Sequence, residues 1–357
     1  MFQSTAITTA SLLTTTLLIT SALAAPSGRI HTAAAAPQHR NRPRAPSAGC
    51  GLTPDIGDGA SKGYKTTAGR DYKVHLPRDY SENTAAPLIF SYHGAGGSVD
   101  QQADLDRLAD VEFNTDHIVV YLQGNADDPT QPDRTTWEGA PENHSDDVSY
   151  TRDVLNAIVA AYCVDEARVY AAGFSQGGGF VGAQLACTAD LSTRFAAYAP
   201  VSGAYYQKQV DQEGECVPDT VSIDCAAMIS SGAADEEGGE VLGRRAAMNV
   251  PIMAFHGGSD DTIHYEGGFR NGACLPTIRH FVDTWVAADG LGAVPVNQTM
   301  EGSSVAMRYG GSEDDALVTL VYAGDEVGHA WMSTATGTAT FEASEWIMAF
   351  FKSHSLA

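Results

Sequence analysis

Residues 168–179 read Arg168-Val169-Tyr170-Ala171-Ala172-Gly173-Phe174-Ser175-Gln176-Gly177-Gly178-Gly179. An apolar run leads into the pattern G-x-S-x-G, and a predicted helix follows it. A serine on a sharp strand-to-helix turn needs neighbours two positions away that have almost no side chain, because the turn is strained and tightly packed. Gly173 and Gly177 meet that need. The stretch therefore predicts a strand, a turn that exposes Ser175, and a helix whose first amides and positive dipole end face the serine.

The surrounding chain, from Tyr72 onward, alternates short apolar runs with amphipathic stretches. This alternation favours a mostly parallel sheet with helices on both faces, in a single domain. The predicted strands are Tyr72–Leu76, Leu88–Tyr92, Ile118–Leu122, Arg168–Phe174, Phe195–Val201, Ile252–Phe255 and Leu317–Tyr322. The predicted helices are Val99–Asp110, Val148–Tyr162, Gln176–Cys187, Thr277–Ala288 and Ala339–Lys352, and Ser145 or Asp146 can cap the second. Together with the turn at Ser175, this order predicts an α/β-hydrolase fold.

A serine hydroxyl becomes a strong nucleophile only when an imidazole removes its proton and a carboxylate orients that imidazole. In this fold the acid and then the histidine follow the serine, on loops after later strands. His329 lies in such a loop, between the last predicted strand and the last predicted helix. Two candidate acids, Asp260 and Asp261, lie in the segment His256-Gly257-Gly258-Ser259-Asp260-Asp261, which directly follows the predicted strand Ile252–Phe255. The spacing favours Asp260, and one of the two aspartates is expected to be a turn residue. His256 is expected to shape the acid loop.

The oxyanion hole must offer backbone N–H groups to the charge that develops on a carbonyl oxygen. The segment His93-Gly94-Ala95-Gly96-Gly97 follows a predicted strand at the position from which this fold donates one amide. We predict the amides of Ala95 and Gln176 as donors and His93 as a prop for the loop. We expect no metal at this site. Trp137, Tyr205 and Trp331 lie on loops that could line a substrate cleft, or they are ordinary loop anchors.

The first 48 residues differ in composition from the rest. Residues 1–24 have the apolar, small-residue layout of a signal peptide, and their apolar run is too short and too rich in Thr and Ser for a membrane span. Residues 25–48 predict a disordered linker or pro-segment before a catalytic domain at 49–357. The domain has 17 Lys and Arg against 44 Asp and Glu. This acidic balance argues against nucleic acid or an anionic membrane as a partner, and it suits a secreted protein that acts on neutral material. We expect the protein to be a monomer.

Six cysteines follow the predicted signal peptide: Cys50, Cys163, Cys187, Cys216, Cys225 and Cys274. In an oxidising compartment their even number predicts three disulfides, and the absence of a CxxC pair makes zinc the minor alternative. The polar segment Tyr205–Asn249 is interpreted as an insertion stapled by a local disulfide. Asn143 and Asn297 lie in N-glycosylation sequons.

Six motifs together resemble the fungal feruloyl esterases: Gly49-Cys50-Gly51, His93-Gly94-Ala95-Gly96-Gly97, Asp146-Asp147-Val148, Gly173-Phe174-Ser175-Gln176-Gly177-Gly178, His256-Gly257-Gly258-Ser259-Asp260 and Gly328-His329-Ala330-Trp331. The resemblance covers nearly everything after Gly49. It implies a secreted, cofactor-free enzyme that cleaves hydroxycinnamoyl esters of plant cell-wall polysaccharide. It also implies a disulfide between Cys163 and Cys187, leaving Cys50 with Cys274 and Cys216 with Cys225.

The same residues fit other functions. An acetylxylan esterase or a polyhydroxybutyrate-type polyester depolymerase would share the three catalytic residues and differ in the acyl pocket. From another class, an inactive hydrolase-like protein could bind wall polysaccharide. Covalent labelling of Ser175 separates an enzyme from a binding protein, and a panel of ferulate, acetyl and hydroxybutyrate esters separates the enzymes.

Overall fold

The computed structural model describes residues 46–126, 130–206, 213–223, 225 and 249–356. The chain divides into two compact units, residues 1–39 and 40–357, and the first lies wholly outside the described residues. The predicted signal peptide and nearly all of the predicted linker also lie outside them. Within the described part, none of the helices has the length and apolar character that a membrane span requires.

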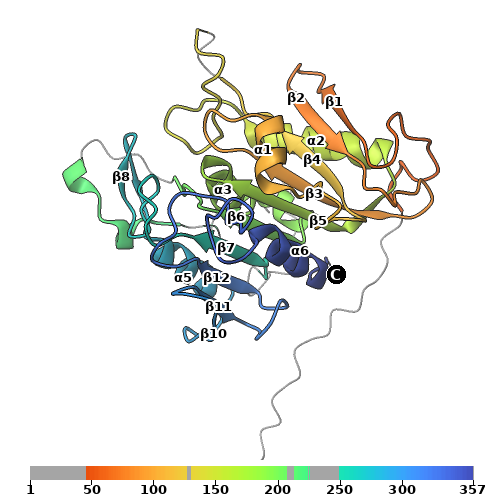
Figure 1. The fold of residues 1–357 in the computed structure, drawn as a ribbon. Helices are drawn as coiled ribbons and strands as arrows, with labels where there is room; N and C mark the ends of the chain where they lie inside the picture. Colours follow the sequence, from red (N-terminus) through yellow and green to blue (C-terminus); the bar gives the residue numbers. More distant parts are fainter. Residues whose placement is uncertain (1–45, 127–129, 207–212, 224, 226–248, 357) are drawn as a thin grey trace, which may run out of the picture. The chain divides into compact units, whose positions relative to one another are not determined.

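A ten-stranded sheet forms the centre of the second unit, in the order β1-β2-β4-β3-β5-β6-β7-β12-β11-β10 (Figure 1). Its six central strands are parallel, and two antiparallel strands flank them at each edge. The strands are β1 Ser61–Lys65, β2 Asp71–His75, β3 Ala86–Tyr92, β4 Ile118–Leu122, β5 Val164–Phe174, β6 Ala197–Val201, β7 Ile252–His256, β10 Val296–Thr299, β11 Val305–Tyr309 and β12 Val318–Tyr322. A separate hairpin joins β8 Gly268–Arg270 to β9 Ala273–Leu275.

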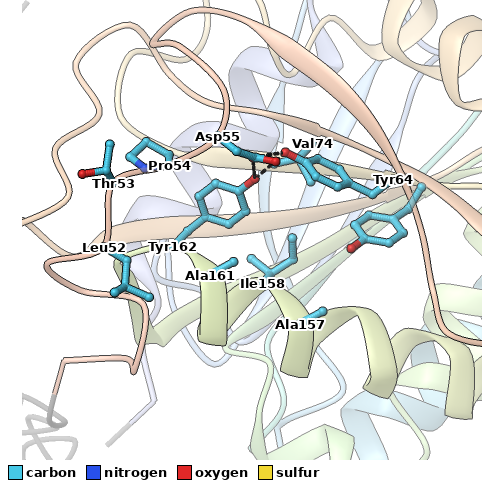
Figure 2. Close-up of a pocket in the computed structure, with 11 residues that line it drawn as sticks. Leu52, Thr53, Pro54, Asp55, Tyr64, Val74, Ala157, Ile158, Ala161 and Tyr162 are labelled. Carbon is cyan, nitrogen blue, oxygen red and sulfur yellow. Dashed lines mark hydrogen bonds between the residues drawn. The ribbon is translucent and has the colours of Figure 1, made fainter.

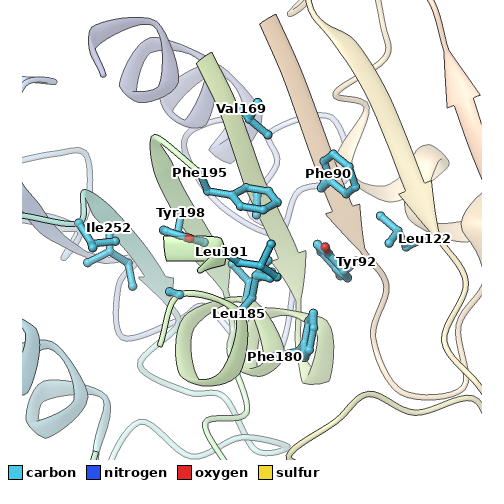
Figure 3. Close-up of a cluster of buried hydrophobic side chains, with 14 of the residues drawn as sticks. Phe90, Tyr92, Leu122, Val169, Phe180, Leu185, Leu191, Phe195, Tyr198 and Ile252 are labelled. Atoms are coloured by element: carbon cyan, nitrogen blue, oxygen red, sulfur yellow. The ribbon is translucent and has the colours of Figure 1, made fainter. Parts of the chain in front are cut away.

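Helices cover both faces of the sheet. They are α1 Val99–Asp106, α2 Asp147–Ala161, α3 Gln176–Phe180, α5 Ile278–Ala288 and α6 Ala343–Ser353, with a π-helical turn Val181–Leu185 after α3 and 3₁₀ turns at Leu191–Thr193, Glu213–Glu215 and Pro218–Thr220. Helices α2, α3 and α5 pack in one apolar cluster, and α6 packs with part of α1 in a second. Phe90 joins the first cluster and its neighbour Ile89 the second, because successive strand residues face opposite sides. Figure 3 shows the first cluster around Phe90, Phe180 and Phe195.

All seven predicted strands and all five predicted helices are present, so the α/β-hydrolase architecture is confirmed. The predicted helix Val99–Asp110 ends earlier, because Arg107 adopts a left-handed conformation. The edge strands β1, β10 and β11 and the hairpin β8–β9 were missed. Strand β10 is exposed at every residue, so it lacks the apolar run that marks a buried strand.

The described chain begins with residues that pack on the end of α2. The Ser47 hydroxyl donates to the Tyr162 carbonyl oxygen at 2.8 Å, and the Gly49 amide donates to the Val159 carbonyl oxygen at 2.9 Å. A cavity of about 390 Å³ lies beside this segment, where Asp55 accepts hydrogen bonds from the hydroxyls of Tyr64 and Tyr162 (Figure 2). Described residues just before the predicted boundary at residue 49 therefore already pack against α2.

The structure contains the expected three disulfides, but the pairing implied by the resemblance is wrong. Cys50 pairs with Cys163, Cys187 with Cys225, and Cys216 with Cys274. Cys163 precedes β5, whose 11 residues extend about 36 Å toward Ser175. The ten helical residues that follow Ser175 rise only about 15 Å, too little to bring Cys187 back to Cys163.

The same geometry explains the other two pairs. The segment around Ser47 holds Cys50 against the start of β5, where Cys163 lies. Cys216 and Cys225 of the predicted insertion each pair with a cysteine outside it. Cys216 pairs with Cys274 on β9, and Cys225 pairs with Cys187 after the π-helical turn. Two disulfides therefore link the insertion to the rest of the domain, and the predicted disulfide within the insertion is wrong.

The two sequons differ in their surroundings. Asn297 is exposed on the edge strand β10. Asn143 is half-buried, and its side-chain amide donates to the Thr136 hydroxyl at 3.1 Å. Glycosylation at either position stays a prediction.

Candidate active site

Ser175 adopts a strained backbone conformation between β5 and α3. Its φ is 53° and its ψ is −116°, a region that residues with a side chain seldom adopt. A Cβ atom at Gly173 would lie 2.5 Å from the Gly177 carbonyl oxygen, and one at Gly177 would lie 2.4 Å from the Tyr92 carbonyl oxygen. The turn therefore needs glycine at both positions, as the sequence predicted.

Ser175, His329 and Asp260 lie in one line of hydrogen bonds at the carboxyl edge of the parallel strands. The Ser175 Oγ atom is 2.9 Å from His329 Nε2, and His329 Nδ1 is 2.7 Å from Asp260 Oδ2. The three residues follow β5, β12 and β7. Because a carboxylate only accepts, Nδ1 carries the ring hydrogen and Nε2 is free to accept the hydroxyl proton of Ser175.

The Asp260 carboxylate is almost fully buried and surrounded by donors. Its Oδ1 atom accepts from the amides of Thr262 at 2.9 Å and Ile263 at 2.7 Å. Burial acts to raise its pKa, but hydrogen bonds from His256 and His329 outweigh burial and hold the pKa well below its usual range. Asp260 is therefore ionised at neutral pH, whereas Asp261 is exposed and does not contact His329.

His256 holds the loop that carries Asp260 in place. Its Nε2 atom donates to the Ile263 carbonyl oxygen at 2.7 Å and lies 3.2 Å from Asp260 Oδ2. The Ser259 amide donates to the Val327 carbonyl oxygen at 3.0 Å, which joins this loop to the loop that carries His329. His256 thus positions Asp260, as expected.

The oxyanion segment leaves two amides available beside Ser175. Within the described part of the chain, the N–H groups of Ala95 and Gln176 have no hydrogen-bond acceptor. The segment around Ala95 is held by its neighbours: the Gly96 amide donates to the Thr135 carbonyl oxygen at 2.7 Å, and the Gly97 amide to the Gly94 carbonyl oxygen at 3.0 Å. Two free amides near a nucleophile are what an oxyanion hole requires.

His93 supports this segment in its neutral form. Its Nε2 atom accepts from the Gly124 amide at 2.8 Å, and its Nδ1 atom donates to the Gly94 carbonyl oxygen at 2.7 Å. Burial lowers the pKa of His93 to about 4, so the ring stays neutral at physiological pH. The role of Gly124 was missed; a Cβ there would lie 2.9 Å from the His93 ring.

The three aromatic residues predicted to line the cleft are core residues instead. Trp137 and Tyr205 are fully buried, and Trp331 nearly so. Trp137 donates its indole N–H to the His93 carbonyl oxygen at 2.7 Å, and Trp331 donates its own to the Ser344 hydroxyl at 2.9 Å. Tyr205 stacks on Phe281. Large aromatic rings gain most when fully buried, so these loops fold inward and the predicted aromatic wall is wrong.

The aromatic ring that does lie beside the nucleophile is Phe174. Its centroid is 5.0 Å from the His329 ring, and its side chain is only half-buried. Because Phe174 directly precedes Ser175 in G-x-S-x-G, the motif itself pointed to this position. The fold, the strained serine and the linked histidine and aspartate define the class of the protein as an α/β-hydrolase.

The comparisons with known proteins place the chain more narrowly. It is 30% identical over 197 residues to feruloyl esterase B of Piromyces equi, which covers 54% of this chain and 30% of that protein. It is 30% identical over 170 residues to feruloyl esterase D of Neurospora crassa, covering 45% of this chain and 54% of that protein. The chain is thus a sequence relative of the fungal feruloyl esterases. It spans at most about half the length of these relatives. No family model matches it.

Solved structures agree on the fold. An acetyl xylan esterase from Aspergillus awamori superimposes with a TM-score of 0.55 at 15% identity, over 82% of this chain and 99% of that one. A feruloyl esterase module from Clostridium thermocellum superimposes with a TM-score of 0.51 at 14% identity, over 83% and 87%. At such identities the likeness supports the α/β-hydrolase fold alone.

Proposed function

We propose that the protein is an exported serine esterase that hydrolyses hydroxycinnamoyl esters of plant cell-wall polysaccharide. The observation that carries the proposal is the hydrogen-bonded line from Ser175 through His329 to Asp260, beside two free amides, in a relative of the feruloyl esterases.

The geometry supports a two-stage mechanism. His329 Nε2 accepts the Ser175 proton as Oγ bonds to the ester carbonyl carbon, and the amides of Ala95 and Gln176 stabilise the charged oxygen. His329 then gives that proton to the leaving alcohol, and the C–O bond of the ester breaks. Water repeats the sequence on the acyl-enzyme: His329 takes its proton, the acid leaves, and Ser175 regains its hydroxyl. No cofactor or metal takes part in these steps.

The compartment and the partners belong to the same proposal. Three disulfides favour an oxidising compartment, and the 44 acidic residues favour uncharged material over nucleic acid or anionic membrane as a partner. We propose that the protein is secreted and acts as a monomer.

The experiment compares esters of one alcohol. We expect kcat/KM for methyl ferulate at least tenfold above that for methyl acetate, which corresponds to about 1.4 kcal/mol of transition-state binding. Ser175→Ala should fold as the wild type, as judged by circular dichroism, yet lose roughly six orders of magnitude in kcat. A folded Ser175→Ala variant that keeps substantial activity would contradict the nucleophile.

An acetyl ester substrate is the second candidate. A bifunctional acetylxylan esterase/xylanase of Neocallimastix patriciarum is 25% identical over 208 residues, covering 57% of this chain and 24% of that protein. Preference for the acetyl ester in the same assay would select this candidate and keep the mechanism.

A further inference from the structure

Asp147, the first residue of α2, is a buried carboxylate that lies outside the line of catalytic residues. Its neighbour Asp146 caps the helix, but Asp147 is fully buried. Its partner is Arg70, just before β2, whose Nη1 atom donates to Asp147 Oδ1 at 2.5 Å. A buried ion pair often adds little net stability, so the contacts that this pair organises are its more informative feature.

The second carboxylate oxygen of Asp147 holds the loop that carries Trp137. Asp147 Oδ2 accepts from the Glu138 amide at 2.6 Å, and the Glu138 carboxylate accepts in return from the Asp147 amide at 2.9 Å. Trp137 donates its backbone amide to Gln176 Oε1 at 3.0 Å and its indole N–H to the His93 carbonyl oxygen at 2.7 Å. Trp137 therefore contacts both halves of the oxyanion hole, and Asp147 holds the residue next to it.

The Arg70 guanidinium supports the oxyanion segment by a second route. Its Nη2 atom donates to the Gln123 carbonyl oxygen at 2.9 Å. The Gln123 side-chain amide donates to the Gly97 carbonyl oxygen at 3.2 Å and lies 3.1 Å from His93 Nε2. His93 and Gly97 are the two ends of the oxyanion segment. Because a guanidinium presents its donors in a rigid fork, Arg70 fixes the two routes relative to each other.

The guanidinium is itself held on its flat side. Its Cζ atom lies 3.7 Å from the centroid of the Tyr150 ring, in a cation–π contact. Tyr150 is on α2 and almost fully buried, and its hydroxyl donates to the Asp71 carbonyl oxygen at 2.5 Å. Only 18% of the Arg70 side chain is exposed. These contacts restrict the guanidinium to one orientation, as a group that positions others requires.

The two amides of the oxyanion hole come from different loops, that of Ala95 after β3 and that of Gln176 after β5. Such donors stabilise the charged oxygen only at hydrogen-bond distance, and losing one typically costs about 10²–10³ in kcat. The two loops must therefore keep a fixed spacing. Trp137 bridges them, and the ion pair of Arg70 and Asp147 holds the loop of Trp137 in place.

We propose that Arg70 and Asp147 are a positioning pair for the oxyanion hole. The pair fixes the loops of Trp137 and Gln123, and those loops hold the two amides that stabilise the charged oxygen. Within the described chain, neither side chain of the pair hydrogen-bonds to any of the three catalytic residues, so both act through other residues. The proposal rests on the proposed esterase function and deepens it, because it assigns the oxyanion hole a support outside the catalytic line.

The first test is Asp147→Asn, with Asp146→Ala as the matched control. One terminal atom of asparagine is a donor, so the contact to Arg70 or the contact to the Glu138 amide is lost. We expect kcat to fall about tenfold on methyl acetate and methyl ferulate alike, with KM changed less than twofold, because the hole acts on the carbonyl oxygen that both esters share. Asp146→Ala removes the cap of α2 and lowers the thermal midpoint, but should change kcat less than twofold.

Inhibition by phenylboronic acid supplies a readout that a loss of stability alone would not move. The boronate forms a tetrahedral adduct with a nucleophilic serine and resembles the transition state. Its inhibition constant should rise about tenfold in Asp147→Asn, in parallel with the fall in kcat, and less than twofold in Asp146→Ala. Values are expressed per active site titrated with a fluorophosphonate. Unchanged values in Asp147→Asn, a loss confined to one ester, or equal losses in Asp146→Ala would overturn the proposal.

Arg70→Lys tests the fork, and it also tests the proposal if Asp147→Asn does not fold. Lysine keeps the positive charge beside Asp147 but replaces the planar fork by a compact ammonium. We expect kcat to fall about threefold to tenfold and the boronate inhibition constant to rise by the same factor, because Gln123 or Asp147 loses its donor. Wild-type values of both quantities would overturn the proposal.

The wild type separates this proposal from the proposed function. A wild type that reacts with the fluorophosphonate and hydrolyses esters, with Asp147→Asn and Arg70→Lys equally active, leaves the esterase function intact and removes the positioning pair. A wild type that hydrolyses no ester and does not react with the fluorophosphonate overturns both.

Discussion

Asp260 meets four donors, whereas its neighbour Asp261 faces solvent. The donors are His329 Nδ1, His256 Nε2 and the amides of Thr262 and Ile263. An asparagine at position 260 would still fit, but its side chain would no longer hold His329 with a hydrogen on Nδ1. Its Oδ1 contacts to the two amides could survive the change.

Asp260→Asn should therefore lower kcat by about 10⁴-fold, and Asp261→Asn should lower it less than threefold. The two variants differ by one position in the same loop, so each controls for the other. Steady-state rates on one ester at fixed pH decide the matter. Similar mild losses in both would remove Asp260 from its role.

The depressed pKa of Asp260 also predicts how stability depends on pH. Hydrogen bonds from His256 and His329 outweigh burial and lower this pKa in the folded state, so the unfolded chain binds the proton more readily. The resulting stabilisation is complete above the ordinary carboxyl pKa of about 3.9 and is lost as the pH falls toward the folded-state value.

We expect the thermal midpoint of the wild type to exceed that of Asp260→Asn by a constant amount between pH 5 and 7, and the difference to shrink below pH 4. Differential scanning calorimetry at matched ionic strength measures both proteins. A difference that grows on acidification would contradict the lowered pKa.

The spaced motif around Ser175 predicted the residue types next to the serine. It did not predict which aromatic side chains would be exposed. Gly173 and Gly177 were predictable because the turn has a local steric requirement. Trp137, Tyr205 and Trp331 were misjudged because burial depends on packing partners distant in sequence, such as Phe281 for Tyr205. Phe174 was visible in the motif, but nothing local indicated that its ring would stay half-buried beside His329.

At the scale of elements, local signals served best at helix starts. Asp146 caps α2 by accepting from the Ser149 amide at 2.8 Å, one of the two predicted caps. Asp147 is instead buried and paired with Arg70 at 2.5 Å, and burial raises its pKa to about 6. Arg70 lies 77 positions away, so no local pattern could reveal this partner.

The oxyanion segment after β3 depends on a second element, the loop that carries Trp137. The Trp137 indole N–H and the Gly124 amide hold the two ends of His93, at its carbonyl oxygen and its Nε2 atom. Removing the indole donor leaves a buried carbonyl oxygen without its partner, which costs about 1 to 3 kcal/mol.

Trp137→Phe should consequently lower kcat about threefold to tenfold on acetyl and feruloyl esters alike, because the donor acts through the oxyanion segment and not on the acyl group. The matched control is Trp331→Phe, which loses a similar hydrogen bond at Ser344, away from that segment. Kinetics on both esters test this. A loss confined to ferulate would mean that Trp137 belongs to the acyl pocket after all.

For the whole molecule, the sequence predicted the central parallel strands and the number of disulfides, but not which cysteines pair. The parallel strands can be recognised as continuous apolar runs in the sequence, because both faces of these strands are buried. Which cysteines pair depends on which helix and strand ends lie close together in the folded protein. Six cysteines allow 15 pairings, and neither parity nor resemblance selected the correct one.

The three disulfides close loops of quite different length, with sequence separations of 113 for Cys50–Cys163, 58 for Cys216–Cys274 and 38 for Cys187–Cys225. Loop entropy grows only with the logarithm of length, so this model assigns about 4 to 5 kcal/mol to each, with the longest about 1 kcal/mol above the shortest. Each contribution is a large fraction of the roughly 5–15 kcal/mol by which a domain is stable.

Replacing both cysteines of a pair by serine should thus lower the thermal midpoint in all three double variants, most in Cys50→Ser/Cys163→Ser. That pair also holds the segment around Ser47 against the end of α2 and the start of β5, so its loss weakens the contacts of Ser47 as well as opening the longest loop. Non-reducing peptide mapping of the wild type checks the pairing itself, and calorimetry of the three variants checks the order. A linked peptide containing Cys163 and Cys187 would contradict the structure, because it would require the start of β5 and the end of the helical segment after Ser175 to meet.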